Sequence, residues 1–378
     1  MKKFISVVLC LCILMGCLPA FAEGETIELK CPSALLMEFS TGNILFEKDS
    51  HAKLPMASVT KIMTMLLAME AIDSGKMTYD DMVTGSSYAK SMGGSTIFLD
   101  EGEQLSVSDI LKGIAVASGN DAAVAMGEHI AGSSEGFVAM MNARASELGM
   151  KDTHFVNCNG LDAEGHYSSA YDIALMSREL MKHEDIFRYT GIWMDSLRNG
   201  AFTLSNTNKL IRFYDGATGL KTGSTDKAKF CISATAKRDG MHLIAVIMAS
   251  PSSKERSADA SKLLNYGFAN YGISQIVQKG ETVGSVHPDK GTDENAEIIC
   301  TRDINILYRK NKRPETKKEI VILPDITAPV KSGDSAGEII ITADGAEFAK
   351  CPIVFKSDVK RMSPMAIFTK IMGKWLSV

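Results

Sequence analysis

The stretch SVTKIMTMLLAMEAI, at residues 58–72, occupies the centre of the predicted fold. It contains neither Gly nor Pro and is rich in Leu, Met and Ala, which predicts a mostly buried helix. Because side chains at positions i and i+3 meet on one face of a helix, the hydroxyl of Ser58 and the amine of Lys61 are expected to lie one turn apart. The same Ser-x-x-Lys spacing begins at four other serines, but only Ser58 starts a strongly helical run.

Strand patterns lie on both sides of this helical region. Two apolar runs between residues 35 and 47 flank a Ser-Thr-Gly-Asn turn and predict a β-hairpin, and residues 229–237 and 241–250 predict a second one. Further helices are predicted at residues 107–117, 121–131, 135–148, 169–182 and 256–271. Strands at both ends with helices between them predict an α+β domain whose sheet pairs N- and C-terminal segments.

The remaining chain predicts a second, smaller domain. The protein has 378 residues, 45% of them hydrophobic and 23% charged, which excludes wholesale disorder and allows more than one domain. Its net charge of −4 excludes a sequence-wide attraction to nucleic acid. We expect the first domain at residues 23–274 and an all-β sandwich or barrel-like domain at residues 275–358. Its predicted strands lie at residues 281–286, 297–300, 319–323, 338–341 and 347–355.

Residues 1–22 have the pattern of a secretory signal peptide. Two lysines precede an apolar run, which ends in the small-x-small sequence Ala20-Phe21-Ala22, so we expect an exported mature chain that begins at Glu23. Two alternatives stay open: a transmembrane anchor, for which the run is short, and lipoprotein processing at Cys17. Export would leave five cysteines, an odd number without metal-site spacing, and we predict no metal.

Residues 359–378 predict an amphipathic helix. Apolar residues, among them Trp375, follow helical spacing, and the segment carries four basic residues and no acid. It is too short and too charged to span a bilayer, so we expect it to lie on a membrane surface. The alternative is a terminal helix that docks on the protein's own core.

Three short motifs that could carry chemistry occur in order along the chain. They are Ser58-Val59-Thr60-Lys61, Ser118-Gly119-Asn120 and Lys221-Thr222-Gly223. A serine hydroxyl is a weak nucleophile unless a nearby base takes its proton, and an amine can do so only when its pKa is lowered. Burial and a neighbouring cation both lower it, and Lys221 is the expected second cation, which could also bind a carboxylate.

The other motif residues have roles that follow from their chemistry. Ser118 and Asn120 present a hydroxyl and an amide that could relay protons and hold a substrate amide. Gly223, without a side chain, would let an extended substrate lie along the strand edge, and the N–H groups of Ser58 and Ser224 are candidates for an oxyanion hole. In the alternative interpretation, Ser58 is only a helix cap, Ser118-Gly119-Asn120 is an ordinary loop and Lys221-Thr222-Gly223 is a surface turn. The occurrence of all three motifs in order argues against it.

With these motifs the sequence resembles the low-molecular-weight penicillin-binding proteins that act as serine-type D-alanyl-D-alanine carboxypeptidases. The similarity runs from about residue 23 to the C-terminus and includes further segments: Asn159-Gly160-Leu161, Asn206-Thr207-Asn208-Lys209-Leu210 and Gly219-Leu220 before the third motif, with Pro55-Met56-Ala57 before the first motif and Asp121-Ala122-Ala123 after the second. The resemblance implies a β-lactamase/transpeptidase-like fold, a β-rich C-terminal domain and a tail that anchors the enzyme peripherally on the outer face of the cytoplasmic membrane. Two departures are Lys229, where relatives often have glycine, and Cys158, where a proline or small residue is expected.

The resemblance also implies a reaction and its partners. The enzyme would remove the terminal D-alanine from peptidoglycan stem peptides without a cofactor, and β-lactam antibiotics would acylate Ser58. Ser58, Lys61 and Ser118 are the expected catalytic residues. The expected substrate-binding residues are Asn120, Lys221, Thr222, Gly223 and Ser224. A β-lactamase, a catalytically silent penicillin-binding sensor and a transpeptidase remain alternatives, although no ExxxN-type segment between Asn120 and Lys221 supplies the base of a β-lactamase.

Overall fold

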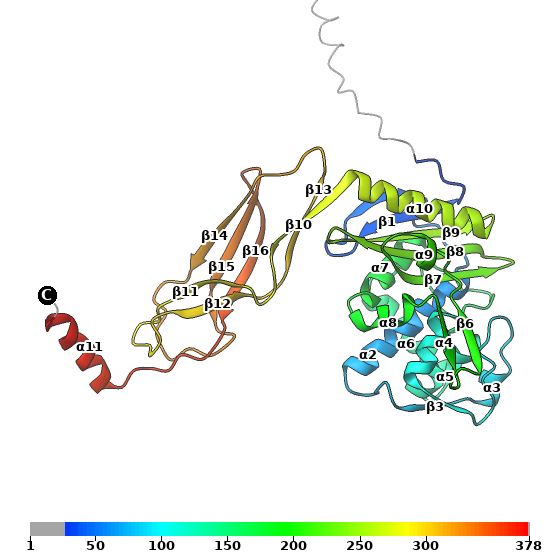
Figure 1. The fold of residues 1–378 in the computed structure, drawn as a ribbon, viewed down its shortest axis with the longest axis horizontal. Helices are drawn as coiled ribbons and strands as arrows, with labels where there is room; N and C mark the ends of the chain where they lie inside the picture. The colour runs from blue at the N-terminus through cyan, green and yellow to red at the C-terminus, as the bar shows by residue number, and fades with distance from the viewer. Residues whose placement is uncertain (1–26, 377–378) are drawn as a thin grey trace, which may run out of the picture.

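The computed structural model describes residues 27–376 (Figure 1). The predicted signal peptide at residues 1–22, with the alternative lipid site at Cys17, lies outside the described residues.

A five-stranded antiparallel sheet forms the frame of the larger part of the molecule. Its strands follow the order β2-β1-β9-β8-β7. Strand β1 pairs with β2 and with β9, and Ser33 lies opposite Met248. The predicted pairing of N- and C-terminal segments is therefore confirmed. The strand bounds are β1 Ser33–Glu38, β2 Ile44–Lys48, β7 Ala217–Thr225, β8 Lys229–Arg238 and β9 Met241–Ser250.

Helices cover both faces of this sheet (Figure 1). On one face, α10 (Ser253–Asn270) packs its apolar side chains against β8 and β9. The opposite face carries the larger core, which centres on α2 (Lys61–Asp73). Around α2 lie α4 (Val107–Ala115), α5 (Asn120–Ala131), α6 (Ser134–Glu147) and α7 (Ala170–Leu180).

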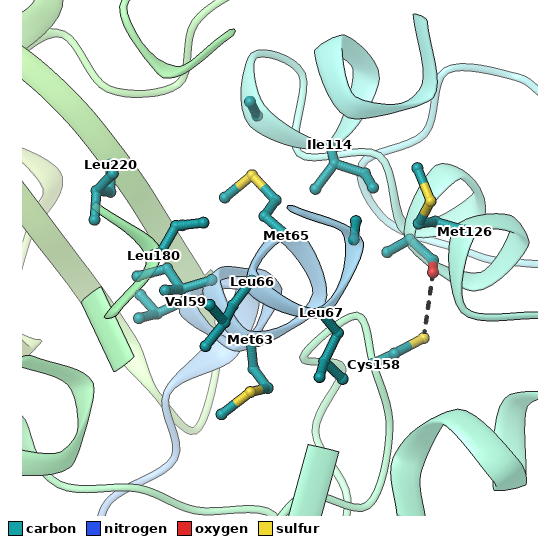
Figure 2. Close-up of a cluster of buried hydrophobic side chains, with 14 of the residues drawn as sticks. Val59, Met63, Met65, Leu66, Leu67, Ile114, Met126, Cys158, Leu180 and Leu220 are labelled. Carbon is teal, nitrogen blue, oxygen red and sulfur yellow. Dashed lines mark hydrogen bonds between the residues drawn. The ribbon is translucent and has the colours of Figure 1, made fainter. Parts of the chain in front are cut away.

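Helix α2 is buried on nearly every side. Its Met and Leu side chains, together with Val59 before it, pack among Ile114, Leu180 and Leu220 from other elements (Figure 2). This burial explains why the segment has a continuous apolar sequence rather than an amphipathic stripe. The predicted helix at residues 58–72 begins with one 3₁₀ turn, η1 (Ala57–Thr60), so Ser58 lies in a tighter turn than predicted.

Several short elements complete this part and were not predicted. None is long enough to show a periodic pattern of apolar residues, which explains their absence from the sequence-based description. They are β3 Met82–Thr84, α3 Ser87–Lys90, β4 Gln104–Ser106, η2 Glu184–Ile186, α8 Phe187–Thr190, β5 Met194–Leu197, β6 Phe202–Ser205 and α9 Leu210–Phe213.

The C-terminal part is all β, as predicted, and has its own core (Figure 1). One sheet has the order β11-β12-β16-β15-β14, and a second pairs β10 with β13. The strands are β10 Tyr271–Val277, β11 Thr282–Val286, β12 Ala296–Cys300, β13 Ile304–Arg309, β14 Thr316–Ile322, β15 Ser335–Ala343 and β16 Ala346–Phe355. Strands β10 and β13 were not predicted, and β10 begins before the predicted domain boundary.

A last helix, α11 (Pro364–Leu376), follows the all-β part. Within residues 27–376, no helix has both the length and the apolar content needed to cross a membrane.

Candidate active site

Ser58 and Lys61 lie in direct contact at the start of α2. Lys61 Nζ lies 2.9 Å from Ser58 Oγ, 2.6 Å from Asn120 Oδ1 and 2.6 Å from the main-chain oxygen of Asn159. The Lys61 side chain is fully buried. Burial lowers the pKa of Lys61 to about 7, although the negative charge of Asp121 opposes this shift.

The three contacts of Lys61 suit a neutral amine. A neutral amine has two N–H donors and one lone pair. As an ammonium, Lys61 Nζ donates all three contacts, including the one to Ser58 Oγ. Once it has lost a proton, Asn120 Oδ1 and the Asn159 carbonyl, which can only accept, keep the two N–H groups, and the lone pair is left for the Ser58 hydroxyl. This arrangement makes Lys61 an acceptor for the proton of Ser58, which is the requirement for a general base.

Lys221 on β7 is the second buried cation of the site. Its Nζ donates to Ser118 Oγ at 2.9 Å and to the Thr222 carbonyl at 2.8 Å. The pKa of Lys221 is lowered well below its ordinary value, first by burial and then by repulsion from Lys61 and Arg256. The two lysines thus lie close enough to repel each other, and each disfavours the charged form of the other, as expected.

Ser118 and Asn120 lie at the turn that leads into α5. Ser118 is buried and has a φ of 63°, a conformation that non-glycine residues rarely adopt. Asn120 contacts Lys61 through Oδ1 and donates from Nδ2 to the Gly93 carbonyl at 2.7 Å. Asn120 therefore positions the amine, a role that the sequence did not suggest, and its amide nitrogen faces the loop around Gly93.

Two glycines lie against the backbone of η1, the 3₁₀ turn that carries Ser58. A Cβ at Gly223 would stand 2.7 Å from Ser58 N, and one at Gly160 would stand 2.0 Å from the Ala57 carbonyl oxygen. Real Cβ atoms are not found at such distances, so both positions require glycine. Beside the expected role of Gly223 in making room for substrate, the structure adds another reason for glycine: its missing side chain lets β7 approach Ser58.

Strand β7 is the edge of the sheet and forms one wall of the site. Thr222 is buried and donates from Oγ1 to Thr207 Oγ1 at 2.7 Å, whereas Ser224 is exposed. The second segment noted in the sequence, around Thr207, therefore supports this wall. An edge strand has unpaired main-chain groups that an extended peptide can bind.

Sequence reasoning missed several residues near the site. Asn159 was noted only as part of a segment, and its main-chain oxygen, which holds Lys61, has no side-chain signal. Asp121 is buried behind Asn120 and accepts main-chain hydrogen bonds from Ile97, Leu99 and Ala122. It thereby fixes the loop that faces Asn120.

Arg256 on α10 is a third buried cation that the motifs did not indicate. Its charge lowers the pKa of Lys221, and burial lowers the pKa of Arg256 itself to about 10. Its Nε has no hydrogen-bond partner among the described residues. A buried cation with an unused donor attracts an anion.

His166 is hydrogen-bonded to η1, the turn that carries Ser58, through Thr60. Thr60 Oγ1 donates to the Ala57 carbonyl at 2.7 Å, so it must accept from His166 Nε2 at 2.8 Å. The Val156 N–H donates to His166 Nδ1 at 3.0 Å. The neutral imidazole therefore uses both ring nitrogens, with Nε2 as donor and Nδ1 as acceptor. Burial, followed by the charge of His154, lowers the pKa of His166 to about 4.

The two departures from the expected pattern have simple structural settings. Lys229 is exposed, with a φ of 55°, which accounts for the glycine expected there. Cys158 is buried, and its thiol lies 3.6 Å from the Ala123 carbonyl oxygen (Figure 2). Burial raises the pKa of Cys158 to about 12, so its thiol stays protonated beside Lys61.

Comparisons with known proteins show which family the chain resembles along its length. Residues 20–252 match the family model described as D-alanyl-D-alanine carboxypeptidase, and residues 271–361 match that of the penicillin-binding protein 5 C-terminal domain. The chain is 44% identical to D-alanyl-D-alanine carboxypeptidase DacF of Bacillus subtilis, over 99% of both chains.

Solved structures are also similar. Penicillin-binding protein 5 of Haemophilus influenzae matches with a TM-score of 0.71 and 29% identity, over 88% of this chain and 98% of that one. Penicillin-binding protein D2 of Listeria monocytogenes, in its cefotaxime-bound form, matches with a TM-score of 0.60 and 30% identity, over 65% of this chain and 100% of that one.

Proposed function

The chain belongs to the D-alanyl-D-alanine carboxypeptidase family, and on this premise we propose that it removes the terminal D-alanine from peptidoglycan stem peptides through an acyl-enzyme on Ser58. The observation that carries the proposal is the 2.9 Å contact between Ser58 Oγ and the buried, pKa-lowered amine of Lys61. β-Lactam antibiotics would acylate the same oxygen.

In the first step, the Ser58 hydroxyl gives its proton to Lys61 Nζ while Oγ attacks the carbonyl carbon between the two D-alanines. The proposed oxyanion hole consists of the N–H groups of Ser58 and Ser224. Asn120 and the Asn159 carbonyl hold Lys61 in place during the transfer. They also stabilise the ammonium that forms, because both are hydrogen-bond acceptors.

The leaving D-alanine carries a carboxylate and needs a proton on its nitrogen. We assign carboxylate binding to Thr222 and Lys221, with the buried charge of Arg256 adding to the attraction. Ser118 would pass its hydroxyl proton to the leaving amine and regain one from Lys221, to which it is already hydrogen-bonded. Lys61, whose pKa is lowered to about 7, then loses to solvent the proton that it took from Ser58, and Lys221 regains one from solvent. Water hydrolyses the acyl-enzyme with neutral Lys61 again as the base, and Lys61 returns the proton of that water to Ser58 Oγ.

Labelling with a fluorescent penicillin tests the nucleophile. We expect mass spectrometry to find the label on Ser58, and the Ser58→Ala variant to lose both labelling and release of D-alanine from a stem-peptide analogue. Ser87→Ala is a matched control, because Ser87 and Lys90 have the same Ser-x-x-Lys spacing in the short helix α3. Label on another residue, or D-alanine release by Ser58→Ala, would overturn the assignment.

The same assays separate the alternative functions. A β-lactamase would release bound penicillin rapidly, and a silent sensor would bind it without releasing D-alanine from peptide. A transpeptidase would transfer the acyl group to an added amino-acid acceptor. Within residues 27–376, no carboxylate is hydrogen-bonded to Lys61 or Ser58, which favours slow penicillin release.

We also propose that the enzyme acts outside the cytoplasm, held peripherally on the outer face of the membrane by residues 359–378. In α11, the side chains of Met365, Phe368 and Met372 are exposed rather than packed on the protein. Exposed apolar side chains beside four basic residues suit an anionic bilayer surface.

Sedimentation with anionic lipid vesicles tests this proposal. A chain ending at residue 358 should stay in solution yet keep its penicillin labelling, because all proposed catalytic residues lie before residue 274. Phe368→Ser should weaken binding without removing charge. Equal sedimentation of the full and shortened chains would contradict the proposal.

A further inference from the structure

Two cysteines of the all-β part lie on one face of neighbouring strands. Cys300 is the last residue of β12, and Cys351 lies in β16, which pairs with β12. Cys300 stands opposite Ile353, and Ile353 shares its face of β16 with Cys351, two residues away. Both cysteines are buried in the same core cluster.

The Cys351 side chain lies beside the end of β12, where Cys300 stands. The Cys351 thiol lies 3.6 Å from Thr301 Oγ1 and 3.9 Å from the Arg302 carbonyl, which belong to the two residues directly after Cys300. Burial, together with the charge and hydrogen bond of Cys351, raises the pKa of Cys300 to about 11. Burial opposes ionisation of Cys351 as well, but hydrogen bonds from Thr301 and Arg302 outweigh it and lower the pKa of Cys351.

The other described cysteines have different surroundings. The thiol of Cys158 lies against the Ala123 carbonyl, and that of Cys231 lies 3.4 Å from the Ala228 carbonyl. Cys31 has Asp259 as its neighbour. Among the cysteines within residues 27–376, an interaction between two thiols is indicated only for Cys300 with Cys351.

We propose that Cys300 and Cys351 are a site of disulfide formation, which joins β12 covalently to β16 when the protein meets a small-molecule disulfide such as oxidised glutathione. This inference is independent of the proposed enzymatic function.

The reaction is a pair of thiol–disulfide exchanges. The Cys351 thiolate attacks one sulfur of the small disulfide, forms a mixed disulfide and releases one small thiolate. Cys300 then loses its proton, and its sulfur attacks the Cys351 sulfur and expels the second small thiolate. The two cysteines are oxidised, the small disulfide is reduced to two thiols, and the released thiolates take up the two protons. Exchange needs local opening at the exposed bend of Thr301 and Arg302.

Peptide mapping of the full chain tests the site. The reduced protein is unfolded in urea and refolded with excess oxidised glutathione, and its free thiols are blocked with N-ethylmaleimide in denaturant. Trypsin should then give one species that contains residues 291–302 joined to residues 351–356, which separates on reduction. Alkylation of both cysteines, or a link from either one to a different cysteine, would overturn the proposal.

Variants add a second measurement. Cys300→Ser and Cys351→Ser should each abolish the linked species, whereas Cys31→Ala, at a distant buried cysteine, should keep it. Adding a reductant should lower the Tm of the oxidised wild-type protein and leave the double serine variant unchanged. The same shift in both proteins would contradict a stabilising link at this site.

Discussion

Gly223 on β7 and Ser58 in η1 meet backbone to backbone, so closely that a methyl group on Gly223 would stand 2.7 Å from Ser58 N. Gly223 thus sets the distance between strand β7 and Ser58. Since Gly160 presses on the same turn from the opposite loop, the position of Ser58 is fixed from two sides.

The first prediction concerns this contact. Gly223→Ala should push β7 away from η1 and slow acylation by penicillin about a hundredfold, because small displacements of reacting groups are costly. Stopped-flow or gel-based labelling rates measure the effect. Gly284→Ala is the control, since a Cβ there makes only ordinary contacts, and an equal loss in both variants would rule out a local cause.

The second prediction is a pH profile. Lys61 must be neutral to accept the serine proton, and its pKa is lowered to about 7, so the acylation rate should rise with pH through about pH 7. Lys61→Arg should lower the rate about 10²- to 10⁴-fold, because a guanidinium stays protonated. A profile that is flat between pH 6 and pH 8 would remove Lys61 as the base.

The third prediction shifts that profile. Asn120→Asp would place a carboxylate 2.6 Å from Lys61 Nζ, which favours the ammonium and raises the lysine pKa. The midpoint of the acylation profile should therefore move up by about one unit or more. Asn265→Asp adds the same charge at an exposed position of α10 and should leave the midpoint in place.

The fourth prediction concerns stability in acid. Burial lowers the pKa values of His166 and His242 to about 4, below the unfolded value of 6.5. Between these values the unfolded chain binds more protons, so the free energy of unfolding should fall as pH drops from 6.5 to 4, by at most about 3 kcal/mol for each histidine.

Urea unfolding at several pH values measures this loss. His242→Gln should make the profile shallower, because one titrating group is removed, whereas His129→Gln, at an exposed position, should not change it. If both variants keep the wild-type slope, His242 is not a source of the acid sensitivity.

Much of the fold could be predicted because long elements carry periodic patterns. The five-stranded sheet pairs the predicted end segments, and α4 to α7 lie within a few residues of their predicted bounds. The short hairpins β3–β4 and β5–β6 could not be predicted, because three or four residues show no period. Strand β10 was hidden because it follows α10 without a turn signal.

The candidate site was predictable to the extent that side-chain types signal chemistry. The structure brings Lys61 into contact with Ser58 and Asn120. It also brings Lys221 into contact with Ser118. The contribution of Asn159 could not be predicted, because it acts through its main-chain oxygen. The roles of Arg256 and His166 depend on burial between distant segments, which no local pattern encodes.

The position of β1 between β2 and β9 also bears on how the protein is made. Its partner in β9 is synthesised on the order of two hundred residues later, and such distant pairings form slowly. Strand β7, which confines Ser58, emerges almost as late. A nascent chain therefore carries the serine and its lysine long before the strands around them exist, so the site can assemble only after residue 250, the end of β9, has been made.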